Sequence, residues 1–198
     1  MRMGSFQSGF GITVALLGAG VPAIADAQDR SAYIAQIGDR DVATIDQSAT
    51  RAEARIDQRG DRNRTTIVQD GTATARAETR QTGNLNMAML HQGGAGDNAA
   101  RLIQAGSGNT ATLTQTAAGA LANAAQLAQT GDGNSMALSQ QGGDNQAALA
   151  QTGDGNAMTA SQIGMGNRLQ WAQNGSNLPD LQISQIGGSA MSITQTGR

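Results

Sequence analysis

Cysteine and lysine are absent from this 198-residue chain, and proline (2 residues) and aromatic residues (2%) are scarce. The lack of cysteine excludes disulfides and thiolate metal sites. So few large apolar residues cannot fill the core of an ordinary globular domain of this length. A net charge of −2 gives no sign of nucleic-acid binding or of a polybasic membrane surface. The chain is therefore either disordered or a repeat protein stabilised by stacking.

The N-terminus carries the one strongly apolar segment. Arg2 precedes an apolar run from about Phe10 to Val21, and small residues follow at 23–27. This order is typical of a Sec-type signal peptide, and the run is too short and glycine-rich for a transmembrane helix. We predict a signal peptide over residues 1–27, with cleavage after Ala25 or Ala27, and one exported domain over residues 28–198.

Glutamine recurs at nearly constant intervals through that domain. Most intervals are 11 residues, and the others are 10, 12 or 14 residues. Isoleucine or leucine usually stands two residues before each glutamine, alanine often four before, and asparagine often six before. The glutamines are Gln36, Gln47, Gln58, Gln69, Gln81, Gln92, Gln104, Gln115, Gln129, Gln140, Gln151, Gln162, Gln173, Gln185 and Gln195.

A spacing of two residues places asparagine, alanine, leucine or isoleucine, and glutamine on one face of a β-strand. The same set would wind around all sides of a helix, so a helix is excluded. The aligned asparagines are Asn63, Asn86, Asn98, Asn109, Asn123, Asn134, Asn145, Asn156 and Asn167. Between the strands lie glycine-rich turns, because glycine adopts positive φ readily. The turn glycines are Gly38, Gly60, Gly83, Gly106, Gly131, Gly153, Gly164 and Gly175.

The turns alternate between two kinds. After Gln36, Gln58, Gln81 and their later equivalents, the asparagine position follows at five residues, whereas after the other glutamines this gap varies from four to eight. The unit is therefore strand–turn–strand, about 22 residues long. Seven full units extend from about Arg30 to Gln185, and a closing strand follows near residues 189–195. Pro179 falls within an expected strand, which we expect to be disturbed there.

Stacking of these units explains the choice of glutamine. Layers of a β-solenoid repeat at about 4.8 Å, so that each inward glutamine lies above an equivalent one. A buried amide without partners costs about 1–3 kcal/mol, and a ladder of amides removes most of that cost. We predict an all-β fold: a β-solenoid of stacked strand–turn–strand repeats with two facing parallel sheets that can form a cross-β fibre.

These repeats resemble those of the bacterial curlin family. The family pattern Ser-x5-Gln-x-Gly-x-Gly-Asn-x-Ala-x3-Gln is close to "QAGSGNTATLTQ" and "QGGDNQAALAQ", and "QIGDRDVATIDQ" keeps it with Asp41 in the asparagine place. The resemblance covers about residues 30–197. It implies a secreted, non-enzymatic subunit of curli: an extracellular amyloid fibre (a fimbrium) at the cell surface, for adhesion and biofilm matrix.

The resemblance also implies partners: the chain itself, a second curli subunit and an outer-membrane curli secretion pore. It implies neither a cofactor nor a nucleic acid. Two family roles stay open, the major subunit, which the neutral repeats after Gln81 favour, and the minor nucleator. The alternative outside the family is a monomeric secreted solenoid that binds a surface. Charge is concentrated in residues 29–81, which carry nine acidic residues and nine arginines, against five and three in residues 82–198.

Overall fold

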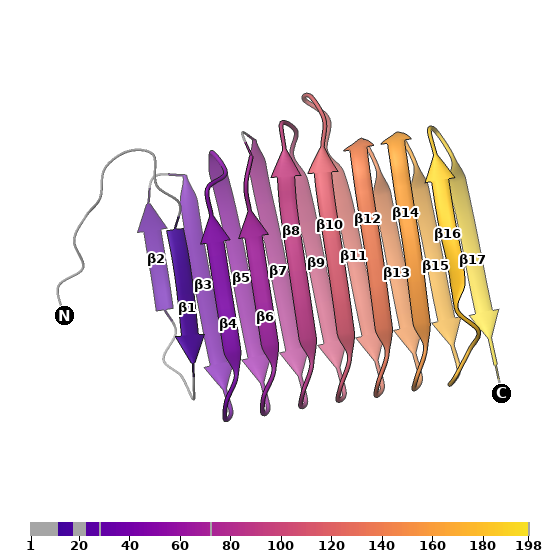
Figure 1. The fold of residues 1–198 in the computed structure, drawn as a ribbon, viewed down its shortest axis with the longest axis horizontal. Coiled ribbons are helices and arrows are strands. Elements are labelled where there is room, and N and C mark those ends of the chain that lie inside the picture. Colours follow the sequence, from indigo (N-terminus) through magenta and orange to yellow (C-terminus); the bar gives the residue numbers. More distant parts are fainter. Residues whose placement is uncertain (1–11, 18–22, 28, 72, 198) are drawn as a thin grey trace.

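The computed structural model describes residues 12–17, 23–27, 29–71 and 73–197, and these form seventeen strands and no helix (Figure 1). The strands are β1 (Ile12–Leu17), β2 (Ala23–Ala27), β3 (Arg30–Ile37), β4 (Val42–Gln47), β5 (Arg51–Arg59), β6 (Arg64–Gln69), β7 (Thr74–Thr82), β8 (Met87–Gly94), β9 (Asn98–Ala105), β10 (Thr110–Ala117), β11 (Asn123–Thr130), β12 (Ser135–Gly143), β13 (Gln146–Thr152), β14 (Ala157–Met165), β15 (Arg168–Asn174), β16 (Leu181–Ile186) and β17 (Ala190–Thr196).

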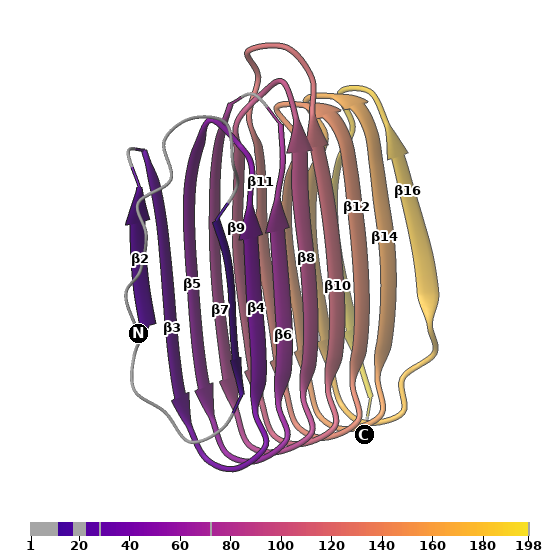
Figure 2. The ribbon, with the colours of Figure 1, turned by 60° about the vertical axis from the view of Figure 1, so that its left-hand side comes forward.

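From β3 onward the chain alternates between two facing sheets (Figure 2). The even sheet has eight strands in the order β1-β4-β6-β8-β10-β12-β14-β16. The odd sheet has nine strands in the order β17-β15-β13-β11-β9-β7-β5-β3-β2. Every solenoid strand pairs in parallel with the strand two positions along the chain, and equivalent glutamines are register partners, as in Gln92, Gln115 and Gln140. The predicted β-solenoid with two facing parallel sheets is confirmed.

The core is a thin double layer of the inward residues predicted from the alternation. Leu113 is fully buried and is in register with Leu90 on one side and Leu138 on the other. Small alanines flank this leucine row, so the two sheets approach closely without large side chains. Trp171 and Met158 occupy inward positions and are also buried.

Two connections depart from the regular repeat. The segment between β10 and β11, residues 118–122, projects beyond the other turns (Figure 1). Pro179 does not lie within a strand as the sequence spacing suggested, because β16 begins only at Leu181. Proline lacks the N–H that a ladder position must donate, so the strand starts after it.

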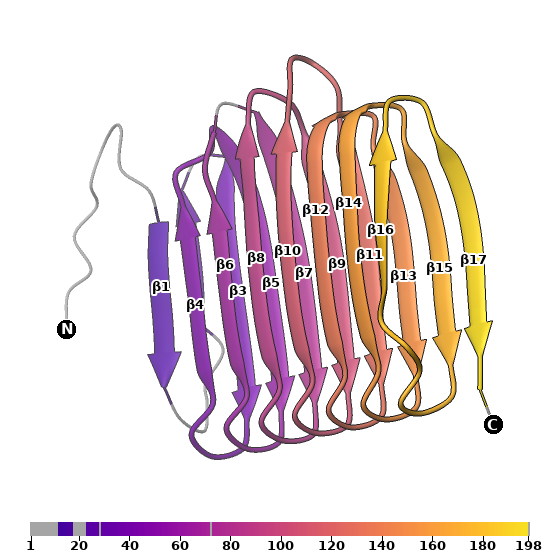
Figure 3. The same cartoon turned by 45° about the vertical axis from the view of Figure 1, so that its right-hand side comes forward.

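The two ends of the solenoid differ. At the N-terminal end, β1 pairs antiparallel with β4 and β2 pairs antiparallel with β3. These strands lie within the predicted signal peptide, whose residues 1–11 and 18–22 are outside the described part. At the C-terminal end, β16 and β17 are the last strands of their sheets (Figure 3), and the inward-register Leu181 and Met191 are 39% and 41% exposed. In the described structure, one end is covered and the other is open.

In the described core, hydroxyls replace aliphatic side chains at Thr65, which is hydrogen-bonded to Gln81, and at Thr79, which is not. Thr79 is fully buried between its register partners Ile56 and Leu102, and its Oγ1 has no hydrogen-bond partner. We expect Thr79→Val to stabilise the fold by about 1 kcal/mol, because it removes a buried unsatisfied hydroxyl at nearly constant volume. Urea unfolding measures the change. Thr82→Val, at an exposed position of the same strand, is the control, and an equal gain there would contradict the explanation.

Candidate functional site: amide ladders and strand edges

The inward glutamines form two continuous hydrogen-bonded ladders, one in each sheet. In every consecutive pair, Nε2 of one glutamine donates to Oε1 of the glutamine in the next layer, at 2.7–2.9 Å. The odd-sheet ladder contains Gln36, Gln58, Gln81, Gln104, Gln129, Gln151, Gln173 and Gln195. The even-sheet ladder contains Gln47, Gln69, Gln92, Gln115, Gln140, Gln162 and Gln185.

From Gln47 onward, each glutamine of the ladders also holds the two sheets together. Gln104 of the odd sheet donates a second hydrogen bond, 3.0 Å long, to the carbonyl of Met87 in the even sheet. Gln115 of the even sheet donates in the same way, at 3.1 Å, to the carbonyl of Ala99 in the odd sheet. Both amide protons and the carbonyl oxygen of an interior rung are therefore used, which is what a fully buried amide requires.

The ladders have a direction. All Nε2 groups donate toward the C-terminal end, so the first rungs lack a donor to their oxygens. Oε1 of Gln36 and Oε1 of Gln47 are buried and have no partner. At the other end, Nε2 of Gln195 makes a hydrogen bond to the carbonyl of Pro179, where every interior rung makes two. The N-terminal end of each ladder therefore offers an acceptor. At the C-terminal end Gln195 makes one hydrogen bond, whereas Nε2 of Gln185 donates to the carbonyls of both Arg168 and Ser189.

The asparagines act mainly on the turn backbone, which differs from the predicted stacking of amide on amide. Nδ2 of Asn86 donates to the carbonyl of Gly106 in the next layer, and Oδ1 accepts the backbone N–H of Asn109. Direct amide–amide hydrogen bonds join Asn86 to Asn63, Asn109 to Asn86, and Asn167 to Asn145. The even-sheet column holds Asn63, Asn86, Asn109, Asn134 and Asn156, and the odd-sheet column holds Asn98, Asn123, Asn145 and Asn167.

The odd-sheet asparagine column begins late. The two positions before Asn98 are Ala52 and Ala75, which form a small apolar cluster with Ala49. Oδ1 of Asn98 is buried without a partner, because the backbone N–H of Asn123 in the next layer donates to the carbonyl of Asp97 instead. Position-by-position variation of this kind cannot be inferred from the repeat pattern alone.

The predicted turn glycines allow the layers to approach each other. At Gly106, φ is 117°, and a Cβ would overlap the carbonyl oxygen of Gly131 in the next layer. Any side chain there would force adjacent turns apart. The same column contains Gly38, Gly60, Gly83, Gly106, Gly131, Gly153 and Gly175, whereas Gly164 belongs to the turns on the opposite edge.

A second turn column was not predicted from the sequence. Three residues after five of the odd-sheet glutamines stands a short polar residue whose side chain accepts the backbone N–H of the turn in the preceding layer, as Asp132 does for Ser107 at 2.6 Å. The signal was present as a repeated Asp, Asn or Ser at that position. The accepting residues are Asp61, Asn84, Asp132, Asp154 and Ser176.

Asp41 occupies the first position of the even-sheet asparagine column. Its Oδ1 accepts the N–H of Asn63 at 2.7 Å, whereas its Oδ2 is buried without a partner. Burial raises the pKa of the Asp41 carboxyl, and the nearby carboxylates of Asp61 and Asp39 act in the same direction, more weakly. A carboxylate is poorly suited to this position because it cannot donate as asparagine does.

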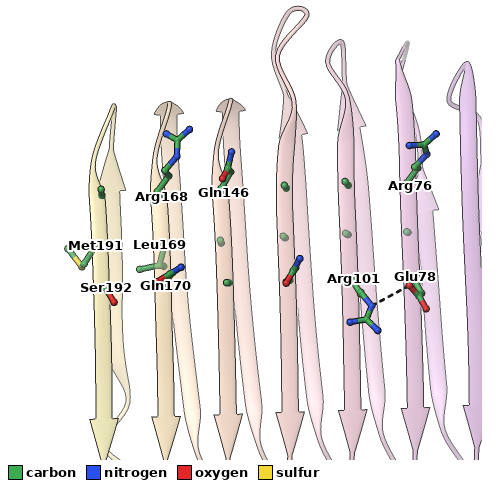
Figure 4. Close-up of a pocket in the computed structure, with 18 of the residues that line it drawn as sticks. Arg76, Glu78, Arg101, Gln146, Arg168, Leu169, Gln170, Met191 and Ser192 are labelled. Atoms are coloured by element: carbon green, nitrogen blue, oxygen red, sulfur yellow. Dashed lines mark hydrogen bonds and ion pairs between the residues drawn. The ribbon is translucent and has the colours of Figure 1, made fainter.

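The outer face of the odd sheet carries a shallow groove that crosses the strands (Figure 4). Small outward residues such as Ala99 and Ala124 form its floor. Arg76, Arg101 and Arg168 lie along it, and Arg101 pairs with Glu78 at 3.4 Å. In the even sheet, Nε2 of His91 lies 3.0 Å from Oδ2 of Asp70, which directly follows the adjacent strand β6, a pairing that the sequence did not indicate.

Comparisons of the chain with family models, with curated proteins and with solved structures give no match. In the described ranges, no group of three or more His, Asp or Glu side chains is placed to hold a metal ion. The part of the chain covered by the structure contains no helix that could cross a membrane.

The ladder predicts a strong difference between inward and outward glutamines. Gln104→Leu should destabilise the fold by about 2–4 kcal/mol, because Gln81 loses its acceptor and Gln129 loses its donor. Gln126→Leu, at an exposed position of the neighbouring strand β11, should change stability by less than about 0.5 kcal/mol. Urea unfolding of both variants measures the difference, and equal effects would show that the ladder contributes nothing.

The burial of the Asp41 carboxyl predicts that its replacement by asparagine changes the free energy of unfolding in a pH-dependent way. Asp41→Asn should stabilise the fold at neutral pH by about 1 kcal/mol, because the amide can donate where Oδ2 is now unpaired. The native pKa is raised, so the cost of the carboxylate is absent below the unfolded pKa and grows as pH rises through the folded pKa. The gain should therefore vanish in acid. Asp39→Asn, exposed in the same turn, is the control, and a gain independent of pH would contradict this account.

Proposed function

We propose that the chain is a secreted structural subunit of an extracellular cross-β fibre of the curlin type, and that it elongates the fibre by adding strands end to end. The proposal rests on one observation: both sheets end at the C-terminal layer in edge strands with no neighbour, and the inward residues there remain partly exposed. An unpaired edge is a template for another chain. The spacing and ladders of the interior supply what such an addition needs.

Once the predicted signal peptide is removed, the N-terminal end also presents unpaired strand edges, as the C-terminal end does. Loss of residues 1–27 would take away β1 and β2 and uncover the backbones of β3 and β4. Processing during export would then create the second growing edge outside the cell. Passage through a curli-type secretion pore and seeding by a second subunit belong to this proposal, and the chain suits the major subunit better than the nucleator because its later repeats are nearly neutral.

The groove on the odd sheet favours a second candidate function, that of a monomeric solenoid which binds a surface. Its floor of small residues crosses several strands, and four arginines lie along it. A flat polymer with acidic groups would suit this face. This candidate requires the chain to stay monomeric, so the same assembly experiment separates the two functions.

Assembly of residues 28–198 in buffer should give fibres with a meridional reflection at about 4.7–4.8 Å and an equatorial reflection near 10 Å. Ile193→Lys, which places a charge in the open end of the core, should abolish elongation measured by thioflavin fluorescence. Thr194→Lys, on the outward face of the same strand, should elongate nearly as well as the parent. A parent chain that sediments as a stable monomer would overturn the fibre proposal and support surface binding.

A further inference from the structure

The solenoid has an odd number of strands. Without β1 and β2, the odd sheet contains eight strands and the even sheet contains seven. The first strand, β3, and the last strand, β17, both belong to the odd sheet (Figures 2 and 3). The chain therefore makes seven and a half layers, and the odd sheet is the outermost one at both ends.

This half layer prevents simple end-to-end stacking of identically oriented copies. If β3 of a second copy were placed on β17, the second copy's β4 would lie two layer spacings from β16, about 9.6 Å away. The even sheet would then miss one strand at every junction. The backbone N–H and C=O groups of two facing strands would have no partner in the fibre interior, which is costly.

We propose that each added copy is rotated by half a turn about the fibre axis, so that the sheets exchange places at every junction. The second copy's β3 then pairs with β16, and its β4 pairs with β17. Successive solenoid strands run in opposite directions in the two sheets, so the half-turn makes both new pairings parallel. This inference rests on the proposed fibre and specifies the surface by which the copies join.

The register and polarity of the ladders agree with this junction. The second copy's Gln36 would lie over Gln185, and its Gln47 would lie over Gln195. The unpaired oxygen of Gln47 would face the amide of Gln195, which makes one hydrogen bond in the single chain. The unpaired oxygen of Gln36 would face the amide of Gln185, which would exchange its 3.2 Å hydrogen bond to the carbonyl of Ser189 for the new one. Ile34 and Ile45 of the second copy would in turn cover Ile183 and Ile193, which are only partly buried in the single chain.

Two even-to-odd turns near the C-terminal end resemble the odd-to-even turns, as the rotation requires. The even-to-odd turn after Gln140 has φ of 113° at Gly142 and 53° at Asp144, close to the 117° and 68° of Gly106 and Gly108 in an odd-to-even turn. The turn after Gln162 repeats this, with Gly164 and Gly166 at 91° and 74°. The turn after Gln185, which is the last of this column, is one residue shorter and has φ of 57° at Gly187 and 65° at Gly188. The second copy's Gly38 would follow this shorter turn.

Two exposed isoleucines distinguish the rotated junction from the direct one. Ile186 is 72% exposed and Ile37 is 63% exposed, the largest values for apolar residues in β16 and β3. Ile186 continues an outward row from its register partner Ile163. The rotation places the second copy's Ile37 next in that row, so that the three side chains cover one another. Direct stacking would place Ile37 beside Thr196 instead.

Cysteine pairs test the geometry, since the chain contains no cysteine of its own. Neighbouring strands bring register partners within the Cα separation of 4.4–6.8 Å that a disulfide needs. Ser184→Cys with Ala35→Cys joins the strands that meet only in the rotated junction. Thr194→Cys with Ala35→Cys joins those that meet only in the direct one. All three sites are outward, and each pair is made both in the full-length chain and in residues 28–198.

After mild oxidation of assembled fibres, the Ser184/Ala35 pair should give a ladder of covalent multimers on non-reducing gels, whereas the Thr194/Ala35 pair should stay monomeric. The reverse pattern, or no cross-linking of either pair within well-formed fibres, overturns the rotated junction. Absence of fibres from the unmodified chain is a different result and overturns the proposed function itself.

A charge exchange gives an independent readout. Ile37→Lys and Ile186→Glu should each reduce elongation at least tenfold, and their combination should restore it to within a few-fold of the parent, because the new charges meet at the rotated junction. The matched control combines Ile37→Lys with Thr196→Glu, which should not restore elongation. Restoration by the control alone would support direct stacking.

Discussion

The structure depends on the exact repetition of equivalent groups from layer to layer at about 4.8 Å. Each buried glutamine is satisfied only because another glutamine lies directly above it, as between Gln92 and Gln115 at 2.9 Å. The same spacing requires glycine where one turn touches the next and permits long linkers where it does not. A substitution that removes an inward side chain therefore breaks contacts with the layers on both sides of it. A substitution in a projecting loop breaks no contact between layers.

Much of the fold was predictable because the sequence repeats at the same interval as the layers. The glutamine spacing indicated the strands, and the two-residue alternation indicated which side chains face inward. What could not be predicted depends on one layer acting on the backbone of another. The asparagines bind turn carbonyls, the Asp132 side chain accepts an N–H from the preceding turn, and the Thr79 hydroxyl is unpaired although threonine is common in strands. These contacts follow from the stacking geometry, which residue types alone do not specify.

The pairing of the N-terminal strands β1 and β2 could not be predicted from the sequence either. The segment 1–27, which the sequence predicts to be an export signal, contains nothing that follows the repeat. Nevertheless, β1 and β2 pair antiparallel with β4 and β3. An open sheet edge presents backbone groups to any extended segment, in either direction, without a demand on side chains. The same property that makes the edges suitable for a second copy lets a non-repetitive segment cover them.

The charges of the N-terminal half bear on register more than on stability. Arg76 pairs with Glu53 and Arg101 pairs with Glu78, but all four side chains are largely exposed, so each pair contributes at most about 1 kcal/mol. A slip by two residues would keep the inward and outward faces unchanged, and the apolar pattern alone would tolerate it. In the observed register of β5 and β7, Glu53, Arg55 and Asp57 face Arg76, Glu78 and Arg80.

A slip in either direction would place like charges opposite each other, Arg55 beside Arg76 or Glu53 beside Glu78. The charges therefore oppose the one misalignment that the alternating pattern allows. The later repeats lack these charges, and there the glutamine ladder and the short glycine turns must maintain the register. We therefore expect the strands of the charged half to pair in the correct register first. The neutral strands that follow would then pair in register with them.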